Sequence, residues 1–168
     1  MNNLIFRNII RFIGLVLLQV LVLNHFNLLG YLNPLVYIIW VFLFPISKNK
    51  SILLLTSFFI GLSIDFFSDS GGIHAAATLF IAFIRLPVLK AVLRKSDFDY
   101  LLFNLRTTSF SKAFLFISVL TIIHHLIVFS LEYFNFNSFV TIISNTLLTS
   151  VFTIFISILG IILFTKKK

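Results

Sequence analysis

Six apolar runs, separated by short polar segments, make up most of this chain. Of its 168 residues, 60% are hydrophobic and only 11% are charged, whereas a soluble domain is about a quarter charged. A chain of this composition lacks the polar surface that a fold in water requires. The sequence therefore predicts an all-α, polytopic membrane protein in which residues 1–168 form a single integral membrane domain.

The apolar runs give the expected spans, because a membrane-spanning helix needs about 20 apolar residues. The first run is expected to be retained rather than removed as a signal peptide, since no small-residue cleavage site follows it. The second run is short, with Pro34 suited to its first turn and Pro45 near its end. The six expected spans are Ile9 to about Leu29, Leu35–Ile46, Ser51–Phe67, Ile73 to about Leu93, Ala113–Leu131 and Phe139–Phe164.

The positive charges give the expected topology. With six spans, all 13 Lys and Arg residues fall on one side of the membrane or in the inner half of the fourth helix. The opposite segments, near residues 24–34, 68–72 and 132–138, contain none. Because cytoplasmic loops are enriched in Lys and Arg, both termini are predicted to be cytoplasmic. A re-entrant second run would put Lys48, Lys50 and the C-terminal lysines on different sides, so we favour six spans.

The net charge of +8 does not indicate nucleic-acid binding. The basic residues lie between apolar runs and form no single patch, so an anionic inner leaflet accounts for them better. The sizeable loop, residues 96–111, has apolar side chains at amphipathic-helix spacing. It is expected to lie on the inner leaflet, with a docking site for a cytoplasmic partner as the alternative.

Ionisable residues within the apolar runs are candidate functional residues, because each is costly in lipid. Counted by helical rise, Asp65 lies about 22 Å from the inner face, and His124 and His125 lie about 18–20 Å from it. An Asp65–His124 pair across two helices is therefore possible. Alternatively, Asp65 reaches the outer headgroups or caps the helix that begins after Gly72. Arg85 is expected to extend toward the inner face.

No residue pattern indicates catalysis, a cofactor or a metal, so we expect no enzymatic activity. The sequence offers no second buried carboxylate and no nucleophile beside a base. The absence of cysteine excludes disulfides and thiolate metal sites. Some side chains have the chemistry of metal ligands, but their positions show no recognisable ligand spacing. These residues are Asp65, Asp69, His74 and His125.

The last run has small hydroxyl or amide side chains at every fourth position, which places them on one helix face. Such a stripe allows close helix packing and interhelical hydrogen bonds. A substrate groove would use the same pattern, but we expect a packing interface. The stripe consists of Thr141, Asn145, Thr149, Thr153 and Ser157.

The segment from Gly61 to Ala77 resembles the signature of MreD, a family of rod-shape-determining membrane proteins. In that family a Gly-x-x-x-Asp at the end of one span precedes a Gly-containing turn and a helix that begins with small residues. Gly61, Asp65, Gly72 and Ala75 fit these positions. The size and six-span layout are also similar, over essentially the whole chain.

This resemblance implies a non-enzymatic scaffold of the bacterial cell-elongation machinery in the inner (cytoplasmic) membrane. Its partners would be an MreC-like single-span protein, an MreB-like filament and the enzymes of peptidoglycan synthesis. MreD-type chains are also similar in architecture to the S-components of vitamin transporters. The alternative is therefore a substrate-binding subunit of a small-molecule transporter, although the first run lacks the Ala-x-x-x-Ala pairs of S-components.

The resembling residues have a physical interpretation. Gly61 would allow a neighbouring helix to approach closely, and Gly72 would permit a tight turn. Asp65 would accept hydrogen bonds from the N-terminus of the next helix, where negative charge is favoured. We expect this turn to fix a face that holds the MreC-like partner.

Overall fold

The computed structural model describes residues 2–26, 32–46, 50–94, 108–134 and 138–164. Their regular elements are all helices, and five of these helices are long and apolar enough to cross a membrane. The chain is thus an all-helical, multi-pass membrane protein. The long helices are α1 (Asn2–Leu21), α3 (Ser51–Ser68), α4 (Ile73–Leu93), α5 (Phe110–Tyr133) and α6 (Phe139–Phe164). Between α1 and α3 lie η1 (Leu23–His25), η2 (Val36–Ile38) and α2 (Ile39–Leu43).

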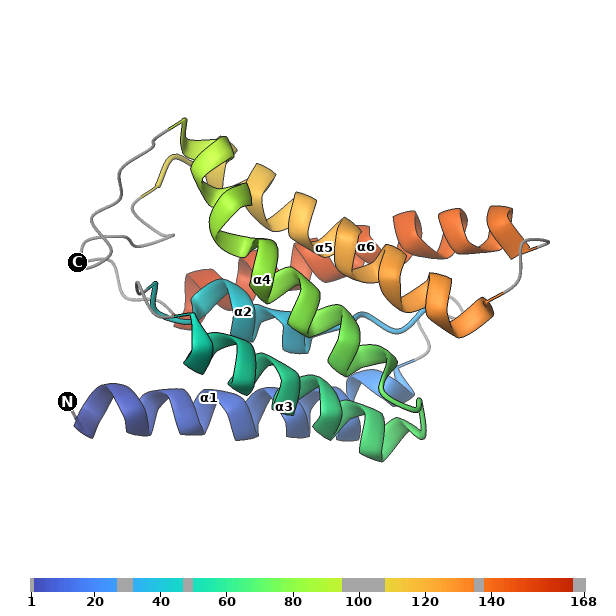
Figure 1. The fold of residues 1–168 in the computed structure, drawn as a ribbon, viewed down its shortest axis with the longest axis horizontal. Helices are drawn as coiled ribbons and strands as arrows, with labels where there is room; N and C mark the ends of the chain where they lie inside the picture. The colour runs from blue at the N-terminus through green and yellow to red at the C-terminus, as the bar shows by residue number, and fades with distance from the viewer. Residues whose placement is uncertain (1, 27–31, 47–49, 95–107, 135–137, 165–168) are drawn as a thin grey trace.

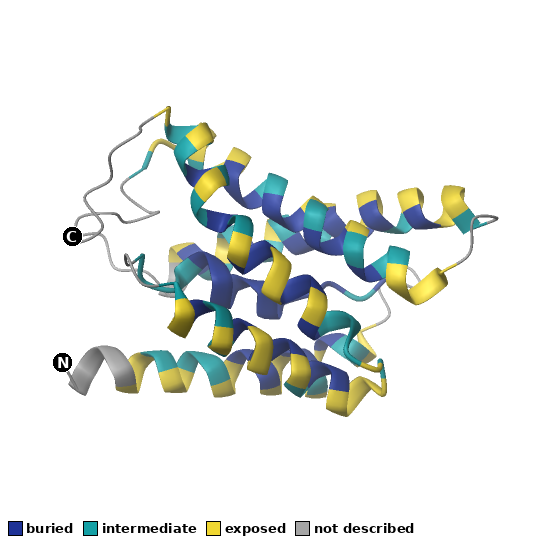
Figure 2. Ribbon diagram, in the orientation of Figure 1, coloured by how far each residue is buried: buried dark blue, intermediate teal, exposed yellow. Residues whose placement is uncertain are grey.

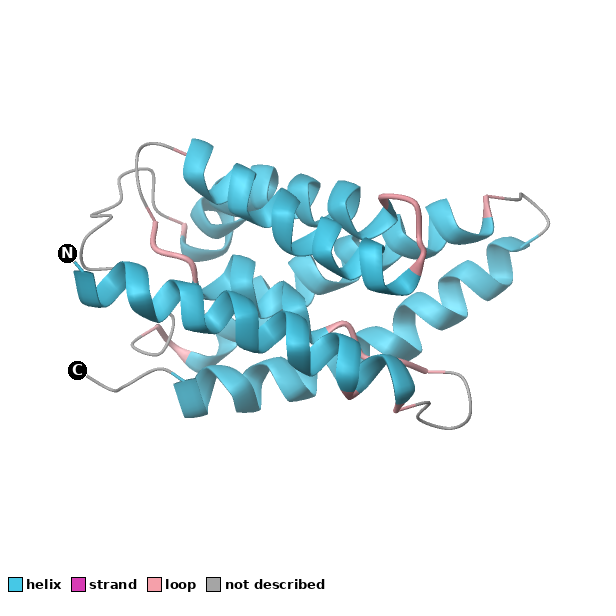
Figure 3. Ribbon diagram, turned by 90° about the horizontal axis from the view of Figure 1, so that it is seen from below, coloured by secondary structure: helices cyan, strands magenta, loops and turns pink. Residues whose placement is uncertain are grey.

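The long helices form a bundle in which α3, α4, α5 and α6 pack against one another in chain order (Figure 1). Helix α1 packs beside α3, and the short α2 contacts α1, α3, α4 and α6. The long helices run lengthwise, so that their ends gather at the two ends of the bundle (Figure 3). Exposed residues lie on the outward faces of the helices, and buried residues face α2 and the interior (Figure 2). The outward faces carry many large apolar side chains, as contact with lipid requires.

The second apolar run does not form one continuous helix over the predicted span, Leu35–Ile46. The chain is non-helical at residues 32–35, makes η2 and the five-residue α2, and becomes extended at Phe44. Pro45 accounts for this end, because a proline moves the residue before it out of the helical region. Residues 36–42 are each at most 4% exposed. Irregular backbone at membrane depth is tolerated where protein encloses it, as here.

The other predicted spans agree with the structure in position. The predictions for the fourth and sixth spans match α4 and α6, and α3 and α5 extend slightly beyond theirs. Helix α1 ends earlier than expected, where Asn24 and His25 bring polar side chains into the run. Most of the predicted interfacial segment, residues 96–111, lies outside the described residues.

Helices α3 and α4 are in close contact at Gly61. A β-carbon at this position would lie 2.6 Å from the Ala75 Cα and 2.6 Å from the His74 carbonyl oxygen. Both neighbours are backbone atoms, so a side chain could not be accommodated by a rotamer change. The close approach expected from the sequence is therefore present, and it sets the distance between α3 and α4.

The structure predicts opposite effects for two Gly→Ala substitutions. Gly61→Ala should lower the free energy of unfolding in detergent by about 1–3 kcal/mol, because α3 and α4 must separate. Gly14→Ala should leave stability unchanged or raise it by up to about 1 kcal/mol, since alanine favours helix and a β-carbon at Gly14 meets nothing within 4 Å. Equal melting temperatures for the two variants would contradict this packing.

Candidate functional site

The carboxylate of Asp65 caps the N-terminus of α4. One oxygen accepts hydrogen bonds from the Ser70 hydroxyl, at 2.5 Å, and the His74 N–H, at 2.9 Å. The other accepts the Ala75 N–H at 2.8 Å. The residue that precedes α4, Gly72, has no side chain to cap the helix, so Asp65 supplies the acceptor from α3. Of the interpretations considered for Asp65, capping of the fourth helix is the one that the structure contains.

The turn between α3 and α4 depends on left-handed backbone conformations. Gly71 and Gly72 have φ angles of 64° and 97°, which glycine adopts without steric cost. Asp69, which ends α3, has a φ angle of 53°. Gly61, Asp65, Gly72 and Ala75 therefore work together as one hairpin: a close contact, a cap, a turn and a capped N–H.

The predicted Asp65–His124 pair is not formed. The His124 Nε2 instead lies 3.0 Å from the Tyr37 hydroxyl, which also lies 2.9 Å from the His74 Nδ1. Tyr37 comes from η2 in the irregular segment (residues 32–46), and its hydroxyl links His74 of α4 to His124 of α5. Tyr37 was not among the residues predicted from the sequence. The available signal was a hydroxyl-bearing residue within an apolar run.

His125 joins α5 to α6 through a chain of hydrogen bonds. Its Nδ1 donates to the Thr121 carbonyl at 2.9 Å, which leaves Nε2 as an acceptor for the Thr153 hydroxyl at 3.0 Å. The Thr153 oxygen in turn accepts the Leu35 N–H at 3.1 Å. One side chain of α6 thereby satisfies both a buried histidine and the backbone of the irregular segment.

The polar stripe of α6 faces the interior over most of its length. Thr149, Thr153 and Ser157 are buried, and Asn145 is half-buried and donates to the Tyr133 hydroxyl at 3.0 Å. Thr141 is exposed near the start of α6. The stripe therefore packs within the chain from Asn145 onward, as small hydroxylated residues between membrane helices do.

Gln19 binds the backbone at the start of the irregular segment. Its Oε1 accepts the Val36 and Tyr37 N–H groups at 2.8 and 3.4 Å, and its Nε2 donates to the Pro34 carbonyl at 3.1 Å. The side chain is 0% exposed. Gln19 was not among the residues predicted from the sequence, although an amide side chain within the apolar first run was the available signal.

Arg85, which was expected to extend toward the inner face, is enclosed within the bundle. It is 3% exposed, and its Nη2 donates to the Phe42 carbonyl at 3.2 Å and the Phe44 carbonyl at 2.5 Å. These carbonyls lie at the C-terminal end of α2, where a helix has no backbone donors of its own. The sequence did not indicate that α2 ends inside the bundle and needs a donor there.

A cavity of about 420 Å³ opens at the end of the bundle where α3 ends and α4 begins. It is bordered by η1, the start of the irregular segment and parts of α1, α3, α4, α5 and α6, and its described lining contains no Lys or Arg. Its volume lies within the range of small-molecule sites, about 300–1,000 Å³. The polar side chains that line it include Asn24, His25, His74, Glu132, Tyr133 and Asn145.

The residues with metal-ligand chemistry do not gather. Among the described residues, no three His, Asp or Glu side chains form a group that could hold a metal ion. Asp69 is exposed in the turn, whereas His125 is buried between α5 and α6.

No protein-family model, curated protein or solved structure matches the chain.

Proposed function

We propose that this chain is a non-enzymatic membrane scaffold of the bacterial cell-elongation machinery. It acts in the cytoplasmic membrane with an MreC-like single-span protein, and through it with an MreB-like filament and peptidoglycan-synthesis enzymes. The observation that carries the proposal is the α3–α4 hairpin, in which the four MreD-like residues form one structural unit. A hairpin that is capped and turned in this way holds its outward face in a fixed orientation.

The outward face of α3 suits a helical partner. Its exposed apolar residues alternate in steps of four and three, which is the spacing of helices that pair in a left-handed crossing. A single-span partner offers one such helix. In this proposal Asp65 acts indirectly, by fixing α3 against α4, and the partner contacts the exposed side. The residues of this face are Leu55, Phe59, Leu62 and Phe66.

We further propose six crossings, with both termini in the cytoplasm. The five long helices supply five crossings. The irregular segment supplies the additional one, the second along the chain, because it connects the end of α1 to the start of α3 through the interior (Figure 1). The first turns of α1 and the last turns of α6 then lie at one end of the bundle. Described cations that fall toward this end are Arg7, Arg11, Lys50, Lys90, Arg94 and Lys112.

Two single-cysteine variants test the topology in a chain that has no cysteine of its own. Asp69→Cys lies in the exposed turn after α3, and Lys112→Cys lies exposed at the start of α5. A membrane-impermeant maleimide applied to intact spheroplasts should label Asp69→Cys alone, and permeabilisation should add Lys112→Cys. Labelling of both variants, or of Lys112→Cys alone, in intact spheroplasts would contradict six crossings.

The scaffold proposal predicts that the hairpin and its outward face control partner binding. Asp65→Ala should reduce co-purification of a co-expressed MreC-like protein, because α4 loses its cap, while membrane insertion is retained. Phe59→Ala should reduce it severalfold without changing the melting temperature, since Phe59 faces lipid when no partner is bound.

The matched control is Phe155→Ala, which removes an exposed phenylalanine from α6. It should leave co-purification unchanged. If Asp65→Ala and Phe59→Ala both bind the partner as the wild type does, the scaffold proposal fails. Equal losses for Phe59→Ala and Phe155→Ala would show that no particular face is used.

The cavity favours a second candidate, a substrate-binding subunit of a small-molecule transporter. A neutral or cationic ligand would suit it, because Glu132 and other polar side chains line the described part of the cavity without Lys or Arg. A thermal-shift screen against water-soluble vitamins in detergent tests this. A ligand at 100 times its Kd adds about 2.7 kcal/mol, so a true ligand should raise the melting temperature clearly. A flat response across the panel would remove vitamins as substrates.

A further inference from the structure

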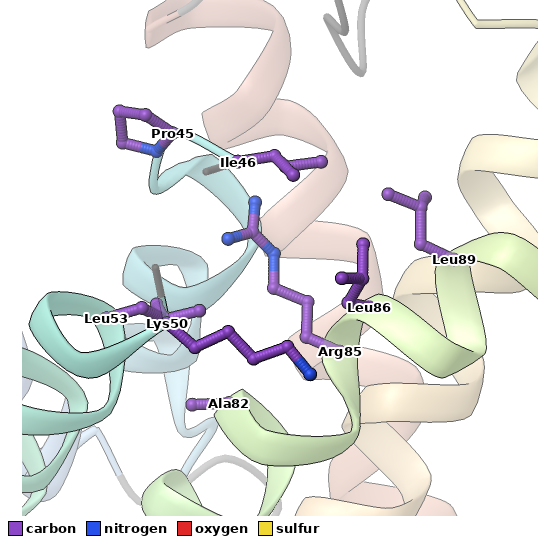
Figure 4. Close-up of a pocket in the computed structure, with 8 residues that line it drawn as sticks. All are labelled: Pro45, Ile46, Lys50, Leu53, Ala82, Arg85, Leu86 and Leu89. Atoms are coloured by element: carbon purple, nitrogen blue, oxygen red, sulfur yellow. The ribbon is translucent and has the colours of Figure 1, made fainter. Parts of the chain in front are cut away.

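A small pocket with two cations lies at the other end of the bundle, between the start of α3 and α4 (Figure 4). Arg85 reaches it from α4, and Lys50 reaches it from the residue that precedes α3. We call it the basic pocket. Its remaining walls are apolar and consist of Pro45, Ile46, Leu53, Ala82, Leu86 and Leu89.

The guanidinium of Arg85 has no carboxylate beside it among the described residues. The described acids are Asp65, Asp69 and Glu132. They lie near the C-terminal ends of α3 and α5, at the end of the bundle away from the pocket. Asp65 binds the N–H of Ala75, and Arg85 follows ten residues later, about 15 Å along α4. The two carbonyls that Arg85 binds are neutral, and its buried Nε has no hydrogen-bond partner. A full positive charge is thus buried without a described counterion.

Two further features make the basic pocket positive. The Lys50 ammonium lies 5.8 Å from the centroid of the Phe83 ring, so it stays beside α4 rather than pointing away from the bundle. Lys50 also precedes the first turn of α3, and its side chain does not cap that helix. A helix N-terminus carries partial positive charge. Arg85, Lys50 and the start of α3 therefore place positive charge on more than one side of the pocket.

We propose that the basic pocket binds the phosphate of an anionic membrane lipid. The pocket has a volume of about 20 Å³, which admits about one water-sized group and therefore only part of a phosphate. A phosphodiester would place an oxygen between the cations and leave its glycerol and acyl parts along the apolar walls. Basic pockets between helices on the cytoplasmic side bind lipid headgroups in this way. The proposal goes beyond the scaffold function and does not depend on it.

The test is lipid binding by the full chain purified in a non-ionic detergent. Phosphatidylglycerol should raise the melting temperature more than phosphatidylcholine does, and inorganic phosphate should have no effect. Lys50→Gln should weaken the apparent affinity for phosphatidylglycerol roughly tenfold, because one charge-assisted hydrogen bond is lost. Lys112→Gln, the matched control on exposed α5 surface, should bind as the wild type does. Arg85→Gln should abolish the difference between the two lipids.

Arg85→Gln also removes the donor to α2, so that variant can fail to fold. Lys50→Gln keeps the proposal falsifiable in that event, since Lys50 does not bind α2. Equal responses to the two lipids, or wild-type affinity in Lys50→Gln, would overturn the lipid site. An equal response to inorganic phosphate would identify a free-anion site and overturn the assignment to lipid. Equal losses in Lys50→Gln and Lys112→Gln would reveal general surface attraction and overturn it as well.

Discussion

The fold depends on satisfying the backbone of a broken segment inside a membrane protein. Residues 32–46 cross the interior with only η2 and the five-residue α2, so their helical hydrogen bonds are incomplete. In lipid an unsatisfied N–H or C=O costs several kcal/mol. Side chains from three long helices supply the missing partners: Gln19 and Thr153 bind the N-terminal part, and Arg85 binds the C-terminal end. Each of these polar residues lies in an otherwise apolar helix because the irregular segment requires a hydrogen-bond partner at that place.

The same requirement connects the two ends of the bundle. Asp65 completes the backbone of α4 as Gln19 completes that of η2, and His74 contributes both a capped N–H and a contact with Tyr37. The hairpin and the irregular segment therefore meet at one residue. A partner that binds the outward face of α3 would act on a hairpin that this network holds in place. The basic pocket lies at the far end of the bundle. There Arg85 donates hydrogen bonds to the end of α2 and lines the pocket together with Lys50.

The sequence predicted the features that depend on local pattern. Hydropathy located α3 to α6, and the Gly61–Ala75 segment predicted the close contact, the turn and the cap. It did not predict the break in the second run, because hydropathy alone cannot distinguish a lipid-facing span from a segment enclosed by protein. Pro34 and Pro45 were local signs of that break.

The partners of several polar residues were not predicted because of the same break in the second run. Asp65 and His124 have similar depths, but Tyr37 stands between them, and its position depends on η2. Arg85 was expected to extend toward the inner face, and the sequence did not show that its guanidinium donates to the end of α2. Depth along a helix can be counted from sequence, whereas the partner across the bundle depends on how every helix is rotated.

Replacement of Gln19 by leucine tests the central claim most directly. Leucine is more apolar, so an account based on hydropathy predicts equal or greater stability for Gln19→Leu. Our account predicts a loss of at least about 2 kcal/mol in the free energy of unfolding in detergent, because the buried N–H groups of Val36 and Tyr37 lose their acceptor. A Gln19→Leu variant as stable as the wild type would contradict it.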